Sequence, residues 1–561
     1  MKKNRAQKSN VKRAAPAAPP RPAPAAAAPI APMPRRYLLW GALLVIAAGG
    51  LIFARLGHYP LWVDEADTAL YARGIALTGD TSAVQGHNLF AVREGTSLVN
   101  LKGRYQPPAP FYLLALFQSA DETGSLVPRL PFAVCGLLCV VLIAVWLATA
   151  RAGGLAWALA SIGLLMNVSF LLYCRQCRYY SLATLLSIGA AYAYVNWRGR
   201  RVYLAAFAAL SILLLLTHYL AYAGLYAAIG VDYLLFHRKA RRLSWGEVLA
   251  VLASQLVVGI VVVSIWNPID KGVTPPFPGR SLLADKLTLV WWHLRDMNAC
   301  EFLPGMALVA APLVWWFWRN PWLLRAWVAI LVYTLATVAL SPQPVAITTF
   351  ADVRYLSALI PLCIFLTLAV LMELTRAQWS FALPLALVVC GTNVLNEPIE
   401  PAKWRSTALD WWRELAAGRE TGMNRAVDYV HSKVAPRASV WVVPDYLTYP
   451  LMYHAPEPVY AWQLRPPPAD QFKNLPRVHF QGGAPPDYML AFGPSRRQVE
   501  RVQGEYRKLG IEYGTAEVIN EYWDDRTRPE LFWRSFAPVT GFNKQSEAIY
   551  FYRRVPARAR D

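Results

Sequence analysis

The sequence predicts a multi-pass α-helical membrane bundle of about 11 spans, followed by a smaller α/β domain outside the membrane. The 561 residues are 56% apolar and only 16% charged, whereas a soluble domain carries about 25% charged residues. Apolar runs near the length of a bilayer span, about 20 residues, recur between residues 37 and 395. After about residue 397, short strand-like runs alternate with helical stretches, which is typical of an α/β domain.

The first 36 residues predict a disordered cytoplasmic tail. They are rich in Ala and Pro, which disfavours a packed core. They contain no acidic residue and nine basic ones: Lys2, Lys3, Arg5, Lys8, Lys12, Arg13, Arg21, Arg35 and Arg36. This positive charge keeps the tail inside and directs the first span outward. The alternative is a cleaved signal peptide, since a basic start is followed by an apolar run at 37–54.

The spans are expected at the apolar runs, and the basic clusters between them set their direction. The runs cover residues 37–56, 129–150, 155–173, 179–197, 202–217, 220–236, 248–266, 302–318, 326–340, 355–373 and 380–395. Clusters such as RGRR and HRKARR all fall on one side, which the positive-inside rule assigns to the cytoplasm. The polar segment 57–127 is then a long outer loop. Its run PFYLLALFQSA is too short to cross and is expected to lie in the interface.

Residues 397–561 are expected to fold outside the membrane. The runs SVWVVP, PVYAW, YMLAFG and AIYFYRRV predict strands, and 495–509 predicts a helix. Ser495 and Gln498 fit a capping box at its start, and Gly510 fits the position just past its end. The domain contains no cysteine, so disulfides do not hold it together.

Two short motifs do not establish the functions with which they are usually associated, an RNA helicase and a zinc site. The letters D-E-A-D begin at Asp64, but an RNA helicase also needs a phosphate-binding loop that contains Gly-Lys, and no Gly-Lys pair occurs. The net charge of +21 indicates membrane topology rather than nucleic acid, because of how the basic residues are distributed along the chain. Cys174 and Cys177 form a C-x-x-C without the second pair of a zinc site. We expect buried helical neighbours, with a disulfide as the alternative.

Charged residues gather at the outer ends of the predicted spans. They are Asp64, Glu65, Asp67, Arg175, Arg178, His218, Asp352 and Arg354. Charges at membrane depth are energetically unfavourable and usually functional. Each has a simpler explanation alone, such as a solvated acid, a lipid-binding arginine or a packed histidine. Acids and cations on one level predict a cavity that accepts a proton on one group and neutralises an anion on another.

Ordered motifs resemble those of one glycosyltransferase family. WVDEADTALYARGIA, GRYQPPAPFYLLALF, PRLPFAVCGLL, CRYYSLATLLS, THYLAYAGLYA and VRYLSALIPL follow one another in the sequence. In this order and topology they resemble the GT-C glycosyltransferases of the protein mannosyltransferase and aminoarabinose transferase type, family 39. The likeness covers roughly residues 35–375.

The resemblance implies an inverting enzyme of the cell (inner) membrane. It would move a sugar from a polyprenyl phosphate to a hydroxyl of a glycan, lipid or protein on the outer side. Asp64 would be the base, and Glu65 would orient a substrate or share that role. The implied donor-phosphate contacts are Arg175, Arg178, His218, Tyr219, Arg354 and Tyr355. The implied acceptor or sugar contacts are Asp67, Tyr105, Gln106 and Tyr179. No cofactor is required, although the three carboxylates leave room for a divalent cation.

Two departures from the aminoarabinose branch bear on the acceptor. Gln106 and Asp67 stand where that branch has a lysine and an arginine, and an added acid disfavours a lipid A phosphate as acceptor.

We expect a loop of Trp291, Trp292 and His293 to roof the cavity. The rival functions are a lipid-linked sugar transporter or flippase and a non-catalytic scaffold. A transporter would show repeated halves and charges at the midplane, and the sequence shows neither.

Overall fold

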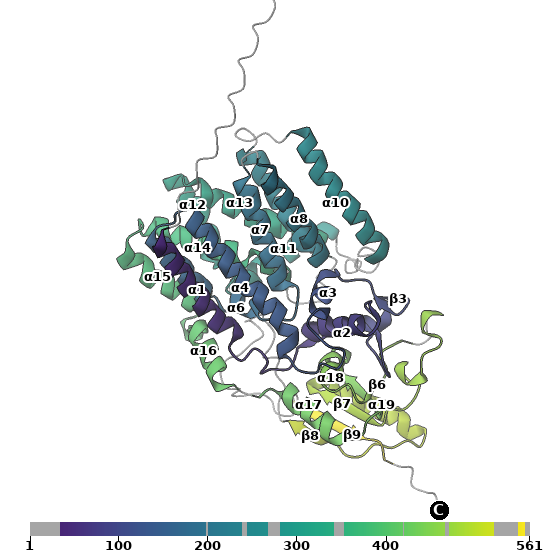
Figure 1. The fold of residues 1–561 in the computed structure, drawn as a ribbon. Helices are drawn as coiled ribbons and strands as arrows, with labels where there is room; N and C mark the ends of the chain where they lie inside the picture. The colour runs from purple at the N-terminus through teal and green to yellow at the C-terminus, as the bar shows by residue number, and fades with distance from the viewer. Residues whose placement is uncertain are drawn as a thin grey trace, which may run out of the picture.

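The computed structural model describes residues 34–197, 200–237, 244–266, 281–341, 353–418, 420–465, 470–520 and 548–555. Most of the expected N-terminal tail and Asp352 lie outside these ranges. A bundle of long helices occupies one end of the molecule and a mixed sheet with its helices the other, with α2 (Val63–Thr78) and α3 (Ala109–Ala115) between them (Figure 1).

Mainly apolar helices form the bundle. They are α1 (Arg35–Phe53), α4 (Leu126–Thr149), α5 (Gly154–Met166), α6 (Val168–Cys174), α7 (Tyr180–Asn196), α8 (Arg201–Thr217), α9 (Tyr219–Asp232), α10 (Trp245–Trp266), α12 (Gly305–Trp318), α13 (Pro321–Leu340), α14 (Ile360–Leu374) and α15 (Trp379–Gly391). The π-helical turn η2 (Tyr233–His237) extends α9, and the 3₁₀ turn η3 (Val353–Leu359) leads into α14. Helices that are apolar all round belong in a membrane or a large core.

Among the residues that the structure describes, six helices are long and apolar enough to cross a membrane, or up to seven if one bent pair is a single span. That pair is α5 and α6, bent by 66°. Asn167 lies at the bend, where its side chain accepts a hydrogen bond from the Phe170 amide at 2.8 Å. The expected apolar runs all contain helix, but several helices fall short of span length, so the count of about eleven stays a prediction.

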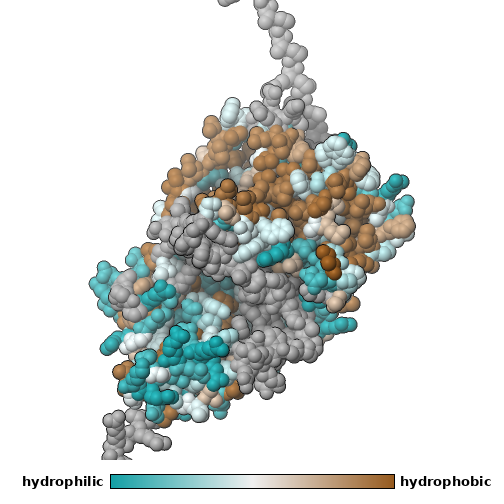
Figure 2. All heavy atoms as spheres, turned by 180° about the vertical axis from the view of Figure 1, so that it is seen from behind, coloured by the Kyte–Doolittle hydropathy of each residue, from teal (hydrophilic) through white to brown (hydrophobic). Residues whose placement is uncertain are grey.

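The surface divides as a membrane protein requires. In Figure 2 apolar side chains cover the bundle and hydrophilic ones cover the opposite end. On α10 the side chains of Leu252, Leu256 and Ile260 are each more than half exposed. A soluble protein rarely exposes so large an apolar surface. The surface of the bundle is therefore suited to contact with lipid.

The segment after α1 holds α2, two short hairpins and α3. The hairpins pair β1 (Val84–Gln85) with β2 (Asn88–Leu89), and β3 (Leu98–Val99) with β4 (Lys102–Gly103), with η1 (Val92–Gly95) between them. Leu116 and Phe117, just after α3, are 81% and 54% exposed. Further along the chain, α11 (Leu282–Ala299) precedes α12.

The C-terminal unit is built on a five-stranded sheet in the order β6-β5-β7-β9-β8. Its elements are η4 (Pro401–Lys403), α16 (Thr407–Ala417), α17 (Gly422–Lys433), β5 (Ser439–Val443), η5 (Asp445–Leu447), α18 (Thr448–His454), β6 (Val459–Tyr460), η6 (Asp470–Phe472), η7 (Arg477–His479), β7 (Tyr488–Phe492), η8 (Gly493–Ser495), α19 (Arg496–Lys508), β8 (Glu517–Asn520) and β9 (Ile549–Arg553). β5 is parallel to β6 and β7, with Val440 opposite Tyr488, and β9 is antiparallel to β7 and β8.

The start and end of α19 differ in how well the sequence predicts them. Gly510 follows the helix with a φ of 75°, as expected for a residue just past a helix end. Ser495 makes no side-chain cap hydrogen bond, because its backbone already has the helical conformation at the end of η8. The predicted capping box is therefore wrong.

One hydrophobic core joins the C-terminal unit to α2. Leu70 of α2, Phe90 and Phe111 belong to the same buried cluster as Leu451 of α18 and Phe551 of β9. This shared core places α2 between the bundle and the sheet, with α18 packed directly on it.

Arg73 of α2 reinforces this packing. Its guanidinium donates hydrogen bonds to the carbonyl oxygens of Glu122 at 2.6 Å and Tyr453 at 2.9 Å. The guanidinium carbon also lies 4.6 Å from the centre of the Tyr453 ring. The helix that carries the predicted acids is thus fixed by the C-terminal unit.

Candidate active site

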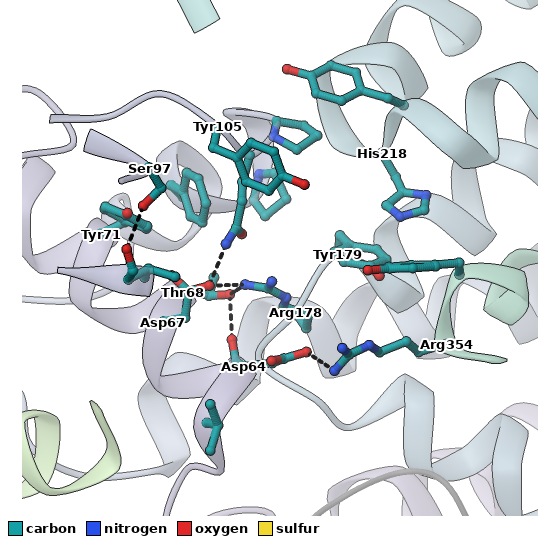
Figure 3. A pocket seen from close by; sticks show the side chains of 18 of the residues that line it. Asp64, Asp67, Thr68, Tyr71, Ser97, Tyr105, Arg178, Tyr179, His218 and Arg354 are labelled. Atoms are coloured by element: carbon teal, nitrogen blue, oxygen red, sulfur yellow. Dashed lines mark hydrogen bonds and ion pairs between the residues drawn. The ribbon is translucent and has the colours of Figure 1, made fainter. Parts of the chain in front are cut away.

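A cavity of about 770 Å³ opens where one end of the helical bundle meets α2 and the C-terminal unit. Ten of the twelve side chains that the sequence predicts for the site line it: Asp64, Asp67, Tyr105, Gln106, Arg178, Tyr179, His218, Tyr219, Arg354 and Tyr355. They come from α2, the segment before α3, the turn before α7, the α8–α9 junction and η3. Several point toward one another across the cavity (Figure 3).

One face of α2 supplies the acids. Asp64, Asp67, Thr68 and Tyr71 all line the cavity. Their spacing of three, four and seven residues brings them onto one side of a helix. The helix begins at Val63, so Asp64 lies in its first turn, where the helix dipole favours negative charge.

Asp64 forms an ion pair with Arg354 across the cavity. The two side chains are 19% and 17% exposed, so solvent and ligands can reach both. The Arg354 guanidinium carbon also lies 5.8 Å from the centre of the Tyr355 ring and 6.0 Å from that of Trp62. A carboxylate beside an arginine stays ionised, and an ionised carboxylate can accept a proton.

Asp67, Gln106 and Arg178 form a second, more deeply buried polar group. Asp67 Oδ2 accepts hydrogen bonds from Gln106 Nε2 at 2.5 Å and from Arg178 Nη1 at 3.2 Å. Arg178 also donates to Thr68 Oγ1 at 2.9 Å. Burial raises the pKa of Asp67, and the charge of Arg178 opposes that rise. Within the described part of the chain, Asp67 Oδ1 and Arg178 Nε are buried without a hydrogen-bond partner.

Aromatic rings form the wall opposite α2. The ring of His218 stacks on Tyr179 with centres 4.1 Å apart and planes at 20°, and Tyr355 lies 5.8 Å from His218. His218 Nδ1 accepts a hydrogen bond from the Ala221 amide at 3.0 Å, so in the neutral ring Nε2 carries the proton. The wall therefore offers flat apolar surfaces and an N–H donor.

Glu65 is placed differently from the prediction, because it does not line the cavity. It is fully buried, and Arg129 of α4 donates to both of its oxygens, at 2.8 Å to Oε1 and 2.5 Å to Oε2. The amide of Cys177 also donates to Oε1 at 2.7 Å. The structure therefore places Glu65, for which the sequence suggested a catalytic role, away from the cavity. Glu65 anchors α2 to α4 and to the turn that carries Arg178.

Arg175 is the second predicted residue outside the lining. It donates to the carbonyl oxygen of Leu51 at 2.8 Å, and its guanidinium carbon lies 5.8 Å from the centre of the Trp411 ring. Arg175 therefore joins α1 to α16 rather than facing a donor phosphate.

The residues that were expected to roof the cavity lie elsewhere. Trp291, Trp292 and His293 belong to α11 rather than a loop, and none lines the cavity. The roof comes instead from the C-terminal unit, with Asp445, Tyr446 and Tyr449 of η5 and α18. No sequence motif marks these three.

Cys174 and Cys177, the two cysteines of the C-x-x-C motif, are buried free thiols. The chain's other cysteines are also free thiols, and all of them are buried except Cys390, which is partly buried.

The positions of the three carboxylates bear on the divalent cation that the sequence left possible. Within the described ranges, no group of three or more His, Cys, Asp or Glu side chains is placed to hold a metal ion. Asp64, Glu65 and Asp67 each pair with a different arginine. A divalent cation needs several oxygen ligands around one point, and these residues do not fit that arrangement.

Comparison with known proteins supports the fold. No protein-family description matches the sequence, and no curated protein does. The structure is similar to ArnT from Cupriavidus metallidurans bound to undecaprenyl phosphate, with a TM-score of 0.54 and 15% identity over 91% of this chain and 98% of that one. The apo state of the same protein gives a TM-score of 0.54 and 13% identity over 92% and 98%. The archaeal oligosaccharyltransferase AglB from Archaeoglobus fulgidus gives 0.41 and 13% over 85% and 71%.

ArnT is a GT-C glycosyltransferase, and this chain has the GT-C fold. The resemblance inferred from the ordered motifs is confirmed at the level of the fold. Together with the apolar helices, this fold makes the chain a multi-pass membrane protein.

Proposed function

We propose that this protein is an inverting glycosyltransferase that moves a sugar from a polyprenyl phosphate to a hydroxyl group on the outer side of the membrane. The observation that carries the proposal is the pair of Asp–Arg contacts in one cavity, Asp64 with Arg354 and Asp67 with Arg178. The solved ArnT structure with undecaprenyl phosphate supports the class of donor.

Asp64 is the proposed base. Its carboxylate is 19% exposed, lines the cavity and pairs with Arg354. When an anionic lipid phosphate enters, it competes with Asp64 for that arginine, because guanidinium binds phosphate and carboxylate alike. Asp64 then turns to the acceptor hydroxyl and takes its proton as the oxygen attacks the sugar carbon. The attack comes from the face opposite the phosphate, so the configuration inverts.

The departing phosphate gains negative charge, which two groups can stabilise. Arg354 carries one positive charge, and Arg178 Nε is a buried donor without a partner among the described residues. Arg178 also stays fixed by Asp67 and Thr68, so its guanidinium does not have to reorganise during the reaction. We propose His218, Tyr219 and Tyr355 as neutral contacts to the phosphate or to the first part of the lipid.

We propose the following topology. Residues 1–36 form a cytoplasmic tail, 37–396 the membrane-embedded catalytic part of about eleven spans, and 397–561 an α/β domain on the outer side of the cell membrane. The position of the basic clusters supports this orientation. The five-stranded sheet of the C-terminal unit supports the class of the last domain. No cofactor is part of the proposed reaction.

The test incubates the purified full-length protein, in lipid nanodiscs, with a panel of labelled polyprenyl-phosphate sugars and with membrane extract as the source of acceptor. Wild type is expected to release polyprenyl phosphate and to label a product. Asp64→Asn is expected to lower the rate by about 10²–10⁴-fold, the contribution of a general base. The variant should keep its elution volume on gel filtration, because Asp64 is at the cavity rim.

Asp80→Asn is the matched control, since Asp80 also pairs with an arginine on the outer segment but does not line the cavity. It should keep full transfer activity. Wild-type turnover in Asp64→Asn would overturn the assignment of the base. Movement of labelled lipid across a vesicle membrane, with no release of polyprenyl phosphate, would favour the transporter instead.

A further inference from the structure

We infer that the acceptor is a neutral, hydroxyl-rich sugar, and that it binds between Asp67 on the floor of the cavity and the η5–α18 turn of the C-terminal unit on its roof. This inference rests on the proposed function and adds the class of its acceptor. Three observations carry it: an unpartnered buried oxygen, the balance of charge in the lining, and the aromatic roof.

The floor offers a hydrogen-bond acceptor that nothing in the described chain satisfies. Asp67 is 5% exposed, lines the cavity, and uses only Oδ2 for Gln106 and Arg178. A buried carboxylate oxygen without a partner costs about 1–3 kcal/mol or more. An O–H group of a ligand can supply the missing donor. Gln106 holds the carboxylate in place, so the free oxygen keeps its direction.

The balance of charge disfavours an anionic acceptor. The described lining contains three carboxylates, of Asp64, Asp67 and Asp445, against the guanidinium groups of Arg178 and Arg354. Each arginine already pairs with an aspartate, and the donor phosphate also requires them. Among the described lining residues, a phosphate on the acceptor would then face carboxylates without a spare cation. Because Arg178 already neutralises Asp67, the floor needs a neutral donor rather than an ammonium group.

The roof suits the apolar face of a sugar ring. Tyr446 is 43% exposed, whereas Tyr449 is buried and fixed edge-on against Phe90, with ring centres 4.9 Å apart and planes at 89°. Asp445 beside them is exposed at the start of η5. Aromatic surfaces pack against C–H groups while nearby carboxylates accept hydrogen bonds from hydroxyls, and a ligand site needs both kinds of contact.

The experiment measures binding in nanodiscs by saturation-transfer NMR. It uses three matched probes: a neutral trisaccharide methyl glycoside, the same glycoside with one 6-phosphate, and the same glycoside with one 6-amino group. Wild type is expected to bind the neutral probe about tenfold more tightly than either charged probe. Asp445→Asn and Tyr446→Ala are each expected to weaken binding of the neutral probe by about tenfold, because each removes one roof contact.

Asp470→Asn is the matched control. Asp470 is also an exposed aspartate at the start of a 3₁₀ turn in the C-terminal unit, but it lies outside the lining. It should bind the neutral probe as wild type does. Binding of labelled polyprenyl phosphate is measured in parallel and should be unchanged in all three variants, which separates a local effect from unfolding.

The outcomes separate the inference from the proposed function. Equal or tighter binding of either charged probe, unchanged binding in both roof variants, or no binding of the neutral probe would each overturn the inference. Failure of wild type to release polyprenyl phosphate from any donor would overturn the proposed function, and that assay contains none of the three probes.

Discussion

The Asp–Arg pairs of the cavity and a third Asp–Arg pair near the other end of α9 differ in how completely their hydrogen bonds are satisfied. The third pair joins Asp232 of α9 to Arg325 of α13 through two contacts of 2.8 Å. Tyr194 donates to Asp232 Oδ2 at 2.9 Å, and His237 Nε2 lies 2.6 Å from Arg325. At 1.5 Å per residue, Asp232 is about 20 Å along α9 from the cavity.

The difference distinguishes a structural pair from a binding site. Both oxygens of Asp232 have partners, and neither Asp232 nor Arg325 lines the cavity. In the cavity, Asp67 Oδ1 and Arg178 Nε are buried and unsatisfied within the described chain. A complete set of hydrogen bonds supports the fold, whereas an incomplete set beside a cavity indicates where a ligand completes it.

The strongest test of this comparison is Asp232→Asn. It leaves the buried charge of Arg325 without its counter-charge, so the free energy of unfolding should fall by about 3–5 kcal/mol. The rate per folded molecule should stay that of wild type. Unfolding can be followed by denaturant titration in detergent. The double variant Asp232→Asn/Arg325→Met should recover part of the loss, because it also removes the unpaired charge. Normal stability with lost turnover would invalidate the comparison.

Glu65→Gln tests the same distinction next to the proposed base. Glu65 is fully buried on Arg129, so this change should also lower the free energy of unfolding by about 3–5 kcal/mol. Residual activity should keep the wild-type dependence of rate on pH, because Glu65 does not line the cavity. A stable variant with no transfer would restore the catalytic role expected from the sequence.

A smaller effect is expected from His454 in the contact between α18 and the segment before α2. His454 Nε2 accepts from the Leu61 amide at 2.8 Å, so Nδ1 carries the proton shared with the Thr123 carbonyl at 2.6 Å. Burial lowers the pKa of His454 to about 3. Between pH 3 and 6.5 the unfolded chain binds the extra proton and the folded chain does not, so stability falls as the pH falls.

The expected loss from this histidine is about 1.4 kcal/mol between pH 7.5 and 5.5. His454→Gln keeps an acceptor for Leu61 but cannot be protonated. The difference in unfolding free energy between wild type and this variant should therefore shrink or change sign as the pH is lowered. A difference that does not depend on pH would show that His454 does not titrate on unfolding.

Ten of the twelve site residues predicted from the sequence line the cavity, but the sequence did not show which face of each element they occupy. Asp64, Arg178 and Arg354 were expected at one level because the basic clusters fix the direction of the spans. Their place in the cavity lining agrees with that level. Glu65 was misplaced because the outer segment was treated as a loop. In a helix, consecutive side chains differ in direction by about 100°, so Asp64 and Glu65 must face different neighbours.

The roof could not be predicted for a different reason. Asp445, Tyr446 and Tyr449 reach the cavity because α18 packs on α2, and that contact joins segments more than 370 residues apart in the chain. Arg129 was counted as the start of a span, although it holds Glu65. Both depend on tertiary packing, which local patterns of hydrophobicity do not encode.

The hydrophobic core shared by α2 and the sheet makes the C-terminal unit inseparable from the cavity. Cutting the chain near residue 397 would expose Leu70, Phe90 and Phe111 to solvent on the N-terminal fragment. It would also expose Leu451 and Phe551 on the C-terminal fragment. Neither fragment would keep a native surface, and Asp64 would lose the support beneath its helix. Chimeras that exchange this unit between proteins of this fold must therefore exchange the segment from α2 to α3 with it.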